Sequence, residues 1–162
     1  MNKMTVSDEG INLIKQFEGL RLEAYKPVPT EKFYTIGFGH YGPDVSPKAK
    51  ITEEKAEKLL REDIKTIEKR LNDMRINFIQ RQFDALVSWI YNLGIGNFNC
   101  STMRQNIIAD FADIKITDEL VRWVKAGGKP LLGLKRRRVA EANMFLGKEV
   151  YYIDEDNNIQ TR

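Results

Sequence analysis

The chain has very little of the chemistry on which several large classes of protein depend. It contains one cysteine, Cys100, and one histidine, His40, among its 162 residues. A single cysteine excludes an internal disulfide, and the two residues together give little support to a cysteine–histidine catalytic site or a dedicated zinc site. We therefore expect a fold that is stable without covalent cross-links, and we expect no metal or other cofactor.

Long apolar runs are also missing. No stretch approaches the roughly 18 apolar residues of a membrane span, and residues 1–6 lack the apolar core of a signal peptide. We expect no stable membrane insertion and expect the protein to stay in the cytoplasm in which it is made. The formal net charge of +3 is mild, so it is compatible with an anionic surface but indicates no particular partner.

The patterns that are present predict a mostly helical α+β chain, organised as one domain or as two small lobes. Capping residues and helical spacing predict helices over about residues 7–18, 52–72, 79–92, 101–108, 117–127 and 134–145. Two aromatic strands are expected over 22–26 and 32–41, and the turn-rich segment 41–47 has room for a short third strand. The helix over 79–92 is the most apolar and is expected to form the core of the second lobe.

Glu18 is the first candidate for catalysis. It continues the helical stripe of Ile11 and Ile14, and Gly19 can end the helix directly after it. Burial and the negative end of the helix dipole would both raise the pKa of this carboxyl group, as a general acid requires. A buried glutamate paired with an arginine would show the same spacing, so both interpretations remain open.

The second predicted strand carries Thr35 on the same face as Gly37 and Gly39. Glycines in a strand leave room for a ligand to approach the backbone, or they mark a bulge or a change of twist. The sequence does not decide between these two roles.

Four ordered segments resemble the phage-type lysozymes, which are also called endolysins or muramidases. They read FEGLRLEAY, YTIGFGH, FDALVSWIYNLGIGNF and GLKRRRVAE, and they extend from about Ser7 to Gly147. The resemblance implies an α+β lysozyme-like fold. A small sheet lobe (about 19–50) would be joined by a long helix to a helical lobe (about 74–147), and a polar tail (148–162) would follow. It also implies a glycoside hydrolase, and the likeness is greatest to endolysins of small tailed phages. Because the polar tail shows no sign of a second domain, we expect no separate wall-binding domain.

The same resemblance implies roles for individual residues. Glu18 would be the general acid, and Thr35 would position the attacking water. Most members have Asp or Cys where this chain has Pro27, which leaves the identity of the second catalytic group open. Glu31 in the same loop is the candidate base, and an exposed glutamate without a role is the alternative.

Substrate-binding residues are implied in both lobes as well. Tyr41, Tyr91 and Ser101 match substrate-cleft positions, although Tyr91 could equally be a core aromatic residue. The basic run 135–138 suggests phosphate binding, but consecutive helical residues point in different directions, which disfavours nucleic-acid binding. The resemblance implies instead that Arg137, or else Arg136, approaches Glu18.

The substrate implied is the glycan strand of bacterial peptidoglycan, cut between N-acetylmuramic acid and N-acetylglucosamine with inversion. Two alternatives remain: a lytic transglycosylase acting on the same bond, and a non-catalytic wall-binding protein on a lysozyme scaffold. We expect a monomer that lyses its host once a holin has released it to the wall.

Overall fold

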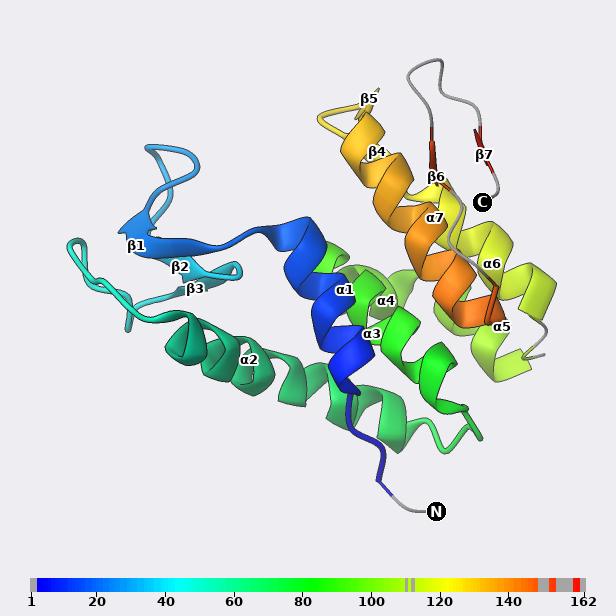
Figure 1. Cartoon of the computed structure of the whole chain (residues 1–162). Helices are drawn as coiled ribbons and strands as arrows, with labels where there is room; N and C mark the ends of the chain where they lie inside the picture. Colours follow the sequence, from blue (N-terminus) through cyan, green and yellow to red (C-terminus); the bar gives the residue numbers. More distant parts are fainter. Residues whose placement is uncertain (1–2, 110, 112, 149–151, 154–158, 161–162) are drawn as a thin grey trace. The chain divides into compact units, whose positions relative to one another are not determined.

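The computed structural model describes residues 3–109, 111, 113–148, 152–153 and 159–160 (Figure 1). The chain forms two compact units: unit 1 consists of Met1–Leu13 and Ile67–Arg162, and unit 2 consists of Ile14–Thr66. Their boundaries fall inside α1 (Asp8–Glu18) and α2 (Glu53–Asp73), so both helices contribute to each unit. Helices predominate and the strands form short antiparallel sheets, which confirms the predicted α+β class.

Unit 2 contains one antiparallel sheet with the strand order β1-β2-β3. Its strands are β1 (Arg21–Tyr25), β2 (Tyr34–Gly37) and β3 (His40–Gly42). The first lies close to the predicted strand over 22–26. The prediction of one continuous strand over 32–41 was wrong, because Gly37 and Gly39 take positive φ angles of 66° and 95° and turn the chain. The residues after this turn form the short third strand.

The core of unit 2 lies between the sheet and the two helix segments. Ile14 from α1, Ile36 from β2, and Leu60 and Ile64 from α2 are each 0–2% exposed. These residues follow the helical and strand periodicities of the sequence, so burial of their side chains brings the end of α1 and the start of α2 to the sheet.

Unit 1 is built mainly from helices (Figure 1). They are α3 (Gln80–Leu93), α4 (Ile95–Cys100), α5 (Thr102–Ala109), α6 (Asp113–Arg122) and α7 (Leu132–Leu146). Two short hairpins pair β4 (Lys125–Ala126) with β5 (Lys129–Pro130), and β6 (Tyr152–Ile153) with β7 (Ile159–Gln160). The last hairpin lies in the predicted polar tail.

Local capping explains why α1 and α2 begin where the sequence predicted. The Ser7 hydroxyl accepts a hydrogen bond from the Gly10 backbone at 3.2 Å, and Thr52 does the same for Lys55 at 3.2 Å. Both side chains satisfy a backbone N–H group that has no partner inside the helix.

Two helix predictions in unit 1 need correction. Helix α6 begins at Asp113 and ends at Arg122, whereas the sequence predicted a start at Thr117 and an end at the glycine pair. Gly127 and Gly128, with φ angles of 56° and 79°, instead form the turn between β4 and β5. Helix α4 was not predicted, because Gly94 was interpreted only as the end of α3, whereas the chain becomes helical again directly after it.

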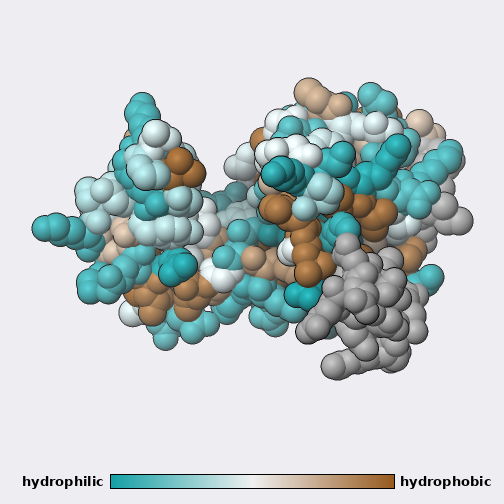
Figure 2. Space-filling model, turned by 90° about the horizontal axis from the view of Figure 1, so that it is seen from above, coloured by the Kyte–Doolittle hydropathy of each residue, from teal (hydrophilic) through white to brown (hydrophobic). Residues whose placement is uncertain are grey.

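Helix α3 provides the centre of unit 1, as predicted. Phe83, Leu86, Val87 and Ile90 are fully buried, although Leu93, also expected in the core, is half-buried. The helix packs against α7, which in turn packs against α6. On the face that Figure 2 shows, hydrophobic residues form several groups among mostly hydrophilic ones. None of the described helices is long and apolar enough to cross a membrane.

Candidate active site

Glu18 is the last residue of α1, as the sequence predicted. Its side chain is half-buried, and Gly19 follows with a φ angle of 70°, which ends the helix. The Gly19 N–H donates to the Lys15 carbonyl at 3.2 Å, so the last helical turn is closed. The carboxylate thus stands at the point where the chain leaves the helix and enters the sheet.

Lys15 fixes the helical turn that carries Glu18. Its ammonium group lies 3.0 Å from Glu57 and 3.5 Å from Glu53 on α2, and 5.1 Å from the centre of the Phe38 ring. The hydrogen bond to Glu57 outweighs desolvation and raises the pKa of Lys15, and the same bond lowers the pKa of Glu57. These contacts hold the end of α1 to the first turns of α2 within unit 2.

Thr35 lies in the middle of β2 and is 6% exposed. It is paired with Tyr25 of β1 and Tyr41 of β3, and the register between β1 and β2 shifts between Arg21 and Tyr25. The strands on both sides therefore fix the position of its side chain.

The structure decides what Gly37 does in the strand. An added Cβ atom would lie 3.2 Å from the Cβ atom of Ala56 on α2, and the positive φ angle of 66° disfavours any other residue. Gly37 thus serves the turn and the close approach of α2 to the sheet, and it does not leave space for a ligand.

Glu31 lies in the loop between β1 and β2 and is half-buried. Its backbone N–H donates to the Val28 carbonyl at 3.0 Å, and its own carbonyl accepts from the Lys26 ammonium at 2.7 Å. The Lys26 ammonium lies 5.0 Å from the centre of the Tyr34 ring, which ties this end of the loop to β2. The loop is therefore held by contacts inside unit 2.

The carboxylate of Glu31 differs from that of an ordinary surface glutamate. Its Oε2 atom is buried and accepts no hydrogen bond from any residue that the structure describes. A buried acceptor without a partner is costly, so such atoms usually bind water or a ligand. This environment differs from the exposed position that the alternative interpretation of Glu31 assumed.

Tyr41 is an exposed aromatic residue of the sheet. Its side chain is 48% exposed, its ring lies edge-on at 5.6 Å from the ring of Phe33, and its hydroxyl accepts from the Phe33 N–H at 3.3 Å. These contacts hold the tyrosine in one orientation while much of its surface stays open to solvent.

The two remaining predicted substrate contacts belong to unit 1. Tyr91 is half-buried on α3. Ser101 is 4% exposed, and its hydroxyl donates to the Phe98 carbonyl at 2.7 Å and accepts from the Arg104 N–H at 3.2 Å. The capping role predicted for Ser101 is therefore confirmed, whereas a direct contact with substrate stays a prediction for both residues.

The basic run 135–138 divides into surface and buried residues. Lys135 is half-buried and Arg136 is exposed, whereas Arg137 and Arg138 are at most 2% exposed. The run is therefore mixed, and its two buried arginines pair with a buried acid, Glu141. The predicted approach of Arg137 to Glu18 stays a prediction.

Glu141 was not among the residues predicted from the sequence, although its spacing was informative. It follows Arg137 by four residues and Arg138 by three, which places all three on one side of α7. Glu141 Oε1 accepts from Ser88 Oγ at 2.7 Å and from Arg137 Nε at 3.0 Å, and Oε2 lies 2.9 Å from Arg138 Nη1. Burial raises the pKa of Glu141, and the charges of the two arginines oppose this effect.

His40 forms a second polar cluster that the sequence did not reveal. Its Nδ1 atom lies 2.9 Å from both carboxylate oxygens of Asp63 on α2, and its Nε2 atom lies 3.0 Å from Asp44. Burial by itself would lower the pKa of His40, but the hydrogen bonds to the two aspartates outweigh burial and raise it. Burial also raises the pKa of Asp63, whereas the bond from His40 lowers that of Asp44.

Comparison with known proteins supports the resemblance read from the sequence. The family model for phage lysozyme matches residues 15–141. An endolysin of Bacillus phage B103 is 50% identical over 147 residues, which cover 90% of this chain and 56% of the relative. The chain thus spans about half the length of the first curated relatives it matches.

Solved structures show the same fold. The muramidase domain of SpmX from Asticaccaulis excentricus superposes with a TM-score of 0.79 at 33% identity, covering 88% of this chain and 97% of that domain. A mutant of P22 lysozyme superposes with a TM-score of 0.75 at 34% identity, covering 88% of this chain and 99% of that one. These matches confirm the expected lysozyme-like fold.

Proposed function

The chain belongs to the phage lysozyme family, and from this premise we propose that it is a glycoside hydrolase acting on bacterial peptidoglycan. The bond cut is the β-1,4 linkage between N-acetylmuramic acid and N-acetylglucosamine, which the muramidase name of one structural neighbour supports. As an endolysin, like its named relatives, the enzyme lyses the host cell after a holin has opened a path to the wall.

One observation carries this proposal. Glu18, Glu31 and Thr35 all lie in unit 2, at a helix end, in a loop and on a strand that adjoin one another in the chain. The two carboxylates are thus presented by one compact unit, as a mechanism with a separate acid and base requires.

Glu18 acts as the general acid in the proposed reaction. Its carboxyl group donates a proton to the glycosidic oxygen while the bond from that oxygen to the anomeric carbon breaks. The closed last turn of α1 and the contacts of Lys15 with α2 hold in place the helical turn that carries this residue.

Glu31 acts as the general base, and Thr35 positions the water. The buried Oε2 atom of Glu31 has an open acceptor site, so it can take the proton of a water that attacks the anomeric carbon. The Thr35 hydroxyl can donate to or accept from that water, and its burial in the strand keeps the group oriented. The attack from the opposite face inverts the sugar, for which the two carboxyl groups are typically about 6.5–9.5 Å apart.

Tyr41 is the proposed substrate contact of unit 2, and Tyr91 and Ser101 stay predicted substrate contacts of unit 1. The exposed ring of Tyr41 can stack on the apolar face of a sugar ring, because its contacts with Phe33 hold it in place. Ser101 contributes chiefly by fixing the start of α5, since its hydroxyl is already bonded at both sides.

The experiment that tests the function measures the turbidity of permeabilised bacterial cells after the protein is added. We expect clearing by the parent and a loss of about 10²–10⁴ in rate for Glu18→Gln, because an amide preserves shape but cannot act as a proton donor. Circular dichroism should show an unchanged fold. Rapid lysis by a folded Glu18→Gln protein would overturn the assignment.

The products distinguish the proposed hydrolase from its alternatives. Mass spectrometry of digested sacculi should show reducing ends, which hydrolysis leaves. Ends of the 1,6-anhydro type would identify a transglycosylase, in which the hydroxyl of muramic acid replaces the attacking water. Binding to the wall without any clearing would identify a non-catalytic wall-binding protein.

A further inference from the structure

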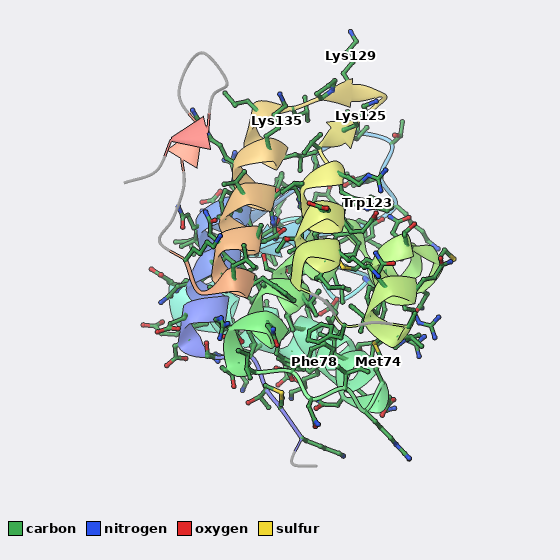
Figure 3. All side chains as sticks on the ribbon, turned by 90° about the vertical axis from the view of Figure 1, so that its right-hand side faces the viewer. Met74, Phe78, Trp123, Lys125, Lys129 and Lys135 are labelled. Carbon is green, nitrogen blue, oxygen red and sulfur yellow. The ribbon has the colours of Figure 1, made fainter. Side chains whose placement is uncertain are left out.

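Three lysines gather at one end of unit 1, and we refer to Lys125, Lys129 and Lys135 as the basic end. Figure 3 shows these three side chains at one end of the unit, with Met74 and Phe78 near the other end. The sequence contributes to this charge in a simple way, since no acidic residue occurs between Glu119 and Glu141.

The fold holds Lys125 and Lys129 on a short, anchored hairpin and Lys135 in the first turn of α7. Strands β4 and β5 pair Lys125 with Pro130 and Ala126 with Lys129, and the Leu131 N–H donates to the Val124 carbonyl at 2.9 Å. The Lys135 N–H donates to the Leu131 carbonyl at 3.0 Å, so Lys135 lies one helical turn beyond the hairpin.

An aromatic contact anchors the base of the hairpin. The ring of Trp123 lies edge-on at 5.5 Å from the ring of Trp89, which is fully buried in α3. The lysines therefore project from a fixed support rather than from a free loop.

The charges of the basic end are not neutralised within the part of the chain that the structure describes. Lys125, Lys129 and Lys135 have no ion pair there, whereas Arg122 beside them pairs with Glu119 at 2.5 Å. Four lysines elsewhere in the described part of the chain, Lys15, Lys50, Lys65 and Lys69, do have an acidic partner. An unbalanced group of like charges attracts an anionic partner and raises its local concentration.

We propose that the basic end binds an anionic wall polymer that carries repeated phosphate groups, such as a polyol-phosphate chain. The inference rests on the proposed function, because an enzyme that cuts the wall encounters such a polymer there. Lysine ammonium groups are flexible point charges, which suit single phosphates repeated along a mobile chain better than a bidentate carboxylate.

The apolar residues beside the lysines fit the same partner. Leu131 and Leu132 are 46% and 40% exposed, which allows contact with the carbon backbone of a polyol chain. Two leucines offer far less apolar surface than the continuous face that interfacial membrane binding needs. A polymer is therefore favoured over a lipid surface.

The test measures sedimentation with purified walls in a Glu18→Gln background, so that the walls stay intact. The variant Lys125→Gln/Lys129→Gln/Lys135→Gln is compared with Lys48→Gln/Lys55→Gln/Lys58→Gln, whose exposed lysines lie in unit 2. Both variants remove the same charge.

We expect the basic-end variant to lose about 10- to 100-fold in affinity. Its plot of log affinity against log salt should be shallower by roughly two units, at about 0.7 for each lost contact. The control should retain the affinity and salt dependence of its parent.

Walls treated with hydrofluoric acid, which cleaves phosphodiesters, provide the second arm. On these walls the two variants should bind equally, and inorganic polyphosphate should compete with untreated walls. Equal loss in both variants would overturn the proposal, as would an undiminished difference on treated walls, which would indicate wall carboxylates. Competition by anionic lipid vesicles but not by polyphosphate would indicate a membrane surface instead.

The proposed function can fail independently of this inference. In that case the catalytically intact parent would leave cells turbid, whereas the sedimentation difference between the variants would persist. If only the inference fails, the basic-end variant that keeps Glu18 should clear cells as the parent does. The same lysine substitutions combined with Glu18→Gln should then leave binding to walls unchanged.

Discussion

Two glutamates, Glu141 in unit 1 and Glu31 in unit 2, show how differently this chain treats a carboxylate away from water. Glu141 is completely buried: its Oε1 atom accepts hydrogen bonds from Ser88 and Arg137, and its Oε2 atom, which has no hydrogen bond among the described residues, lies 2.9 Å from Arg138 Nη1. Glu31 is only half-buried, and its buried oxygen has neither a hydrogen bond nor an ion pair among the described residues.

The difference separates a structural charge from a candidate for catalysis. The charge of Glu141 is compensated by two cations and a hydroxyl group, which leaves little capacity for a ligand. The open oxygen of Glu31 raises the energy of the folded protein slightly but can bind a water or a proton. Substitutions at the two positions should therefore affect different properties.

The largest effect is expected for Glu31→Gln on turnover. If Glu31 is the base, the rate should fall by about 10²–10⁴, with little change in stability because a partly exposed loop carboxylate contributes little to folding. The acidic limb of the pH–rate profile should also disappear. The control is Glu23→Gln, an exposed glutamate of the neighbouring strand. An unchanged rate and an unchanged bell-shaped profile would leave Glu18 as the only assigned acid.

Glu141→Gln should show the opposite pattern. Removing one partner from a buried ion-pair cluster leaves two buried guanidinium groups uncompensated, which typically costs about 3–5 kcal/mol in the free energy of unfolding. Urea denaturation would measure this loss, with Glu62→Gln, an exposed helical glutamate, as the control. A loss no greater than that of the control would contradict the structural role.

His40→Asn tests a cluster of intermediate burial, with an expected loss of about 1–3 kcal/mol from the two charge-assisted hydrogen bonds. The pKa of His40 is raised in the folded protein, so its contribution is complete below the ordinary value and is lost as pH rises through the folded value. At the acid end, protonation of Asp63 removes the partner. The unfolding free energies of the parent and of His40→Asn should therefore differ most at pH values between the protonation of Asp63 and the deprotonation of His40. A difference that is constant with pH would argue against an ion pair.

Asp44→Asn and Asp63→Asn sharpen that experiment. The Asp44 side chain is 63% exposed and that of Asp63 is 28% exposed. We expect the exposed partner to contribute less than about 1 kcal/mol and Asp63 to contribute more, because solvent screens the exposed ion pair.

The smallest effect is expected for Ser101→Ala. Loss of the cap at the start of α5 should cost about 1 kcal/mol, with little effect on KM at a temperature where the variant is folded. Thr102→Ala, at an exposed neighbouring position, is the control. A large rise in KM at full stability would instead support direct contact between Ser101 and the glycan.

The sequence alone determined the parts of this protein that depend on neighbouring residues. Ser7 and Thr52 begin helices, and Gly19 ends one, because a cap satisfies backbone groups within the same turn. The burial of α3 and of the Ile11–Ile14 stripe also followed from helical periodicity. Motifs in their order along the chain were enough to indicate the family, which the comparisons then confirmed.

Only the tertiary structure decided which charged groups are buried and what surrounds them. Arg136, Arg137 and Arg138 are identical residues in sequence, yet the packing of α7 against α3 leaves the first exposed and buries the other two. Arg137 then bonds to Ser88 and Arg138 to Asn92. The partners of His40 and the open oxygen of Glu31 likewise arise where distant segments pack together or a loop folds back on itself. The energy of a charge depends on its distance to every nearby group and on its exposure to water, and packing between distant segments sets both.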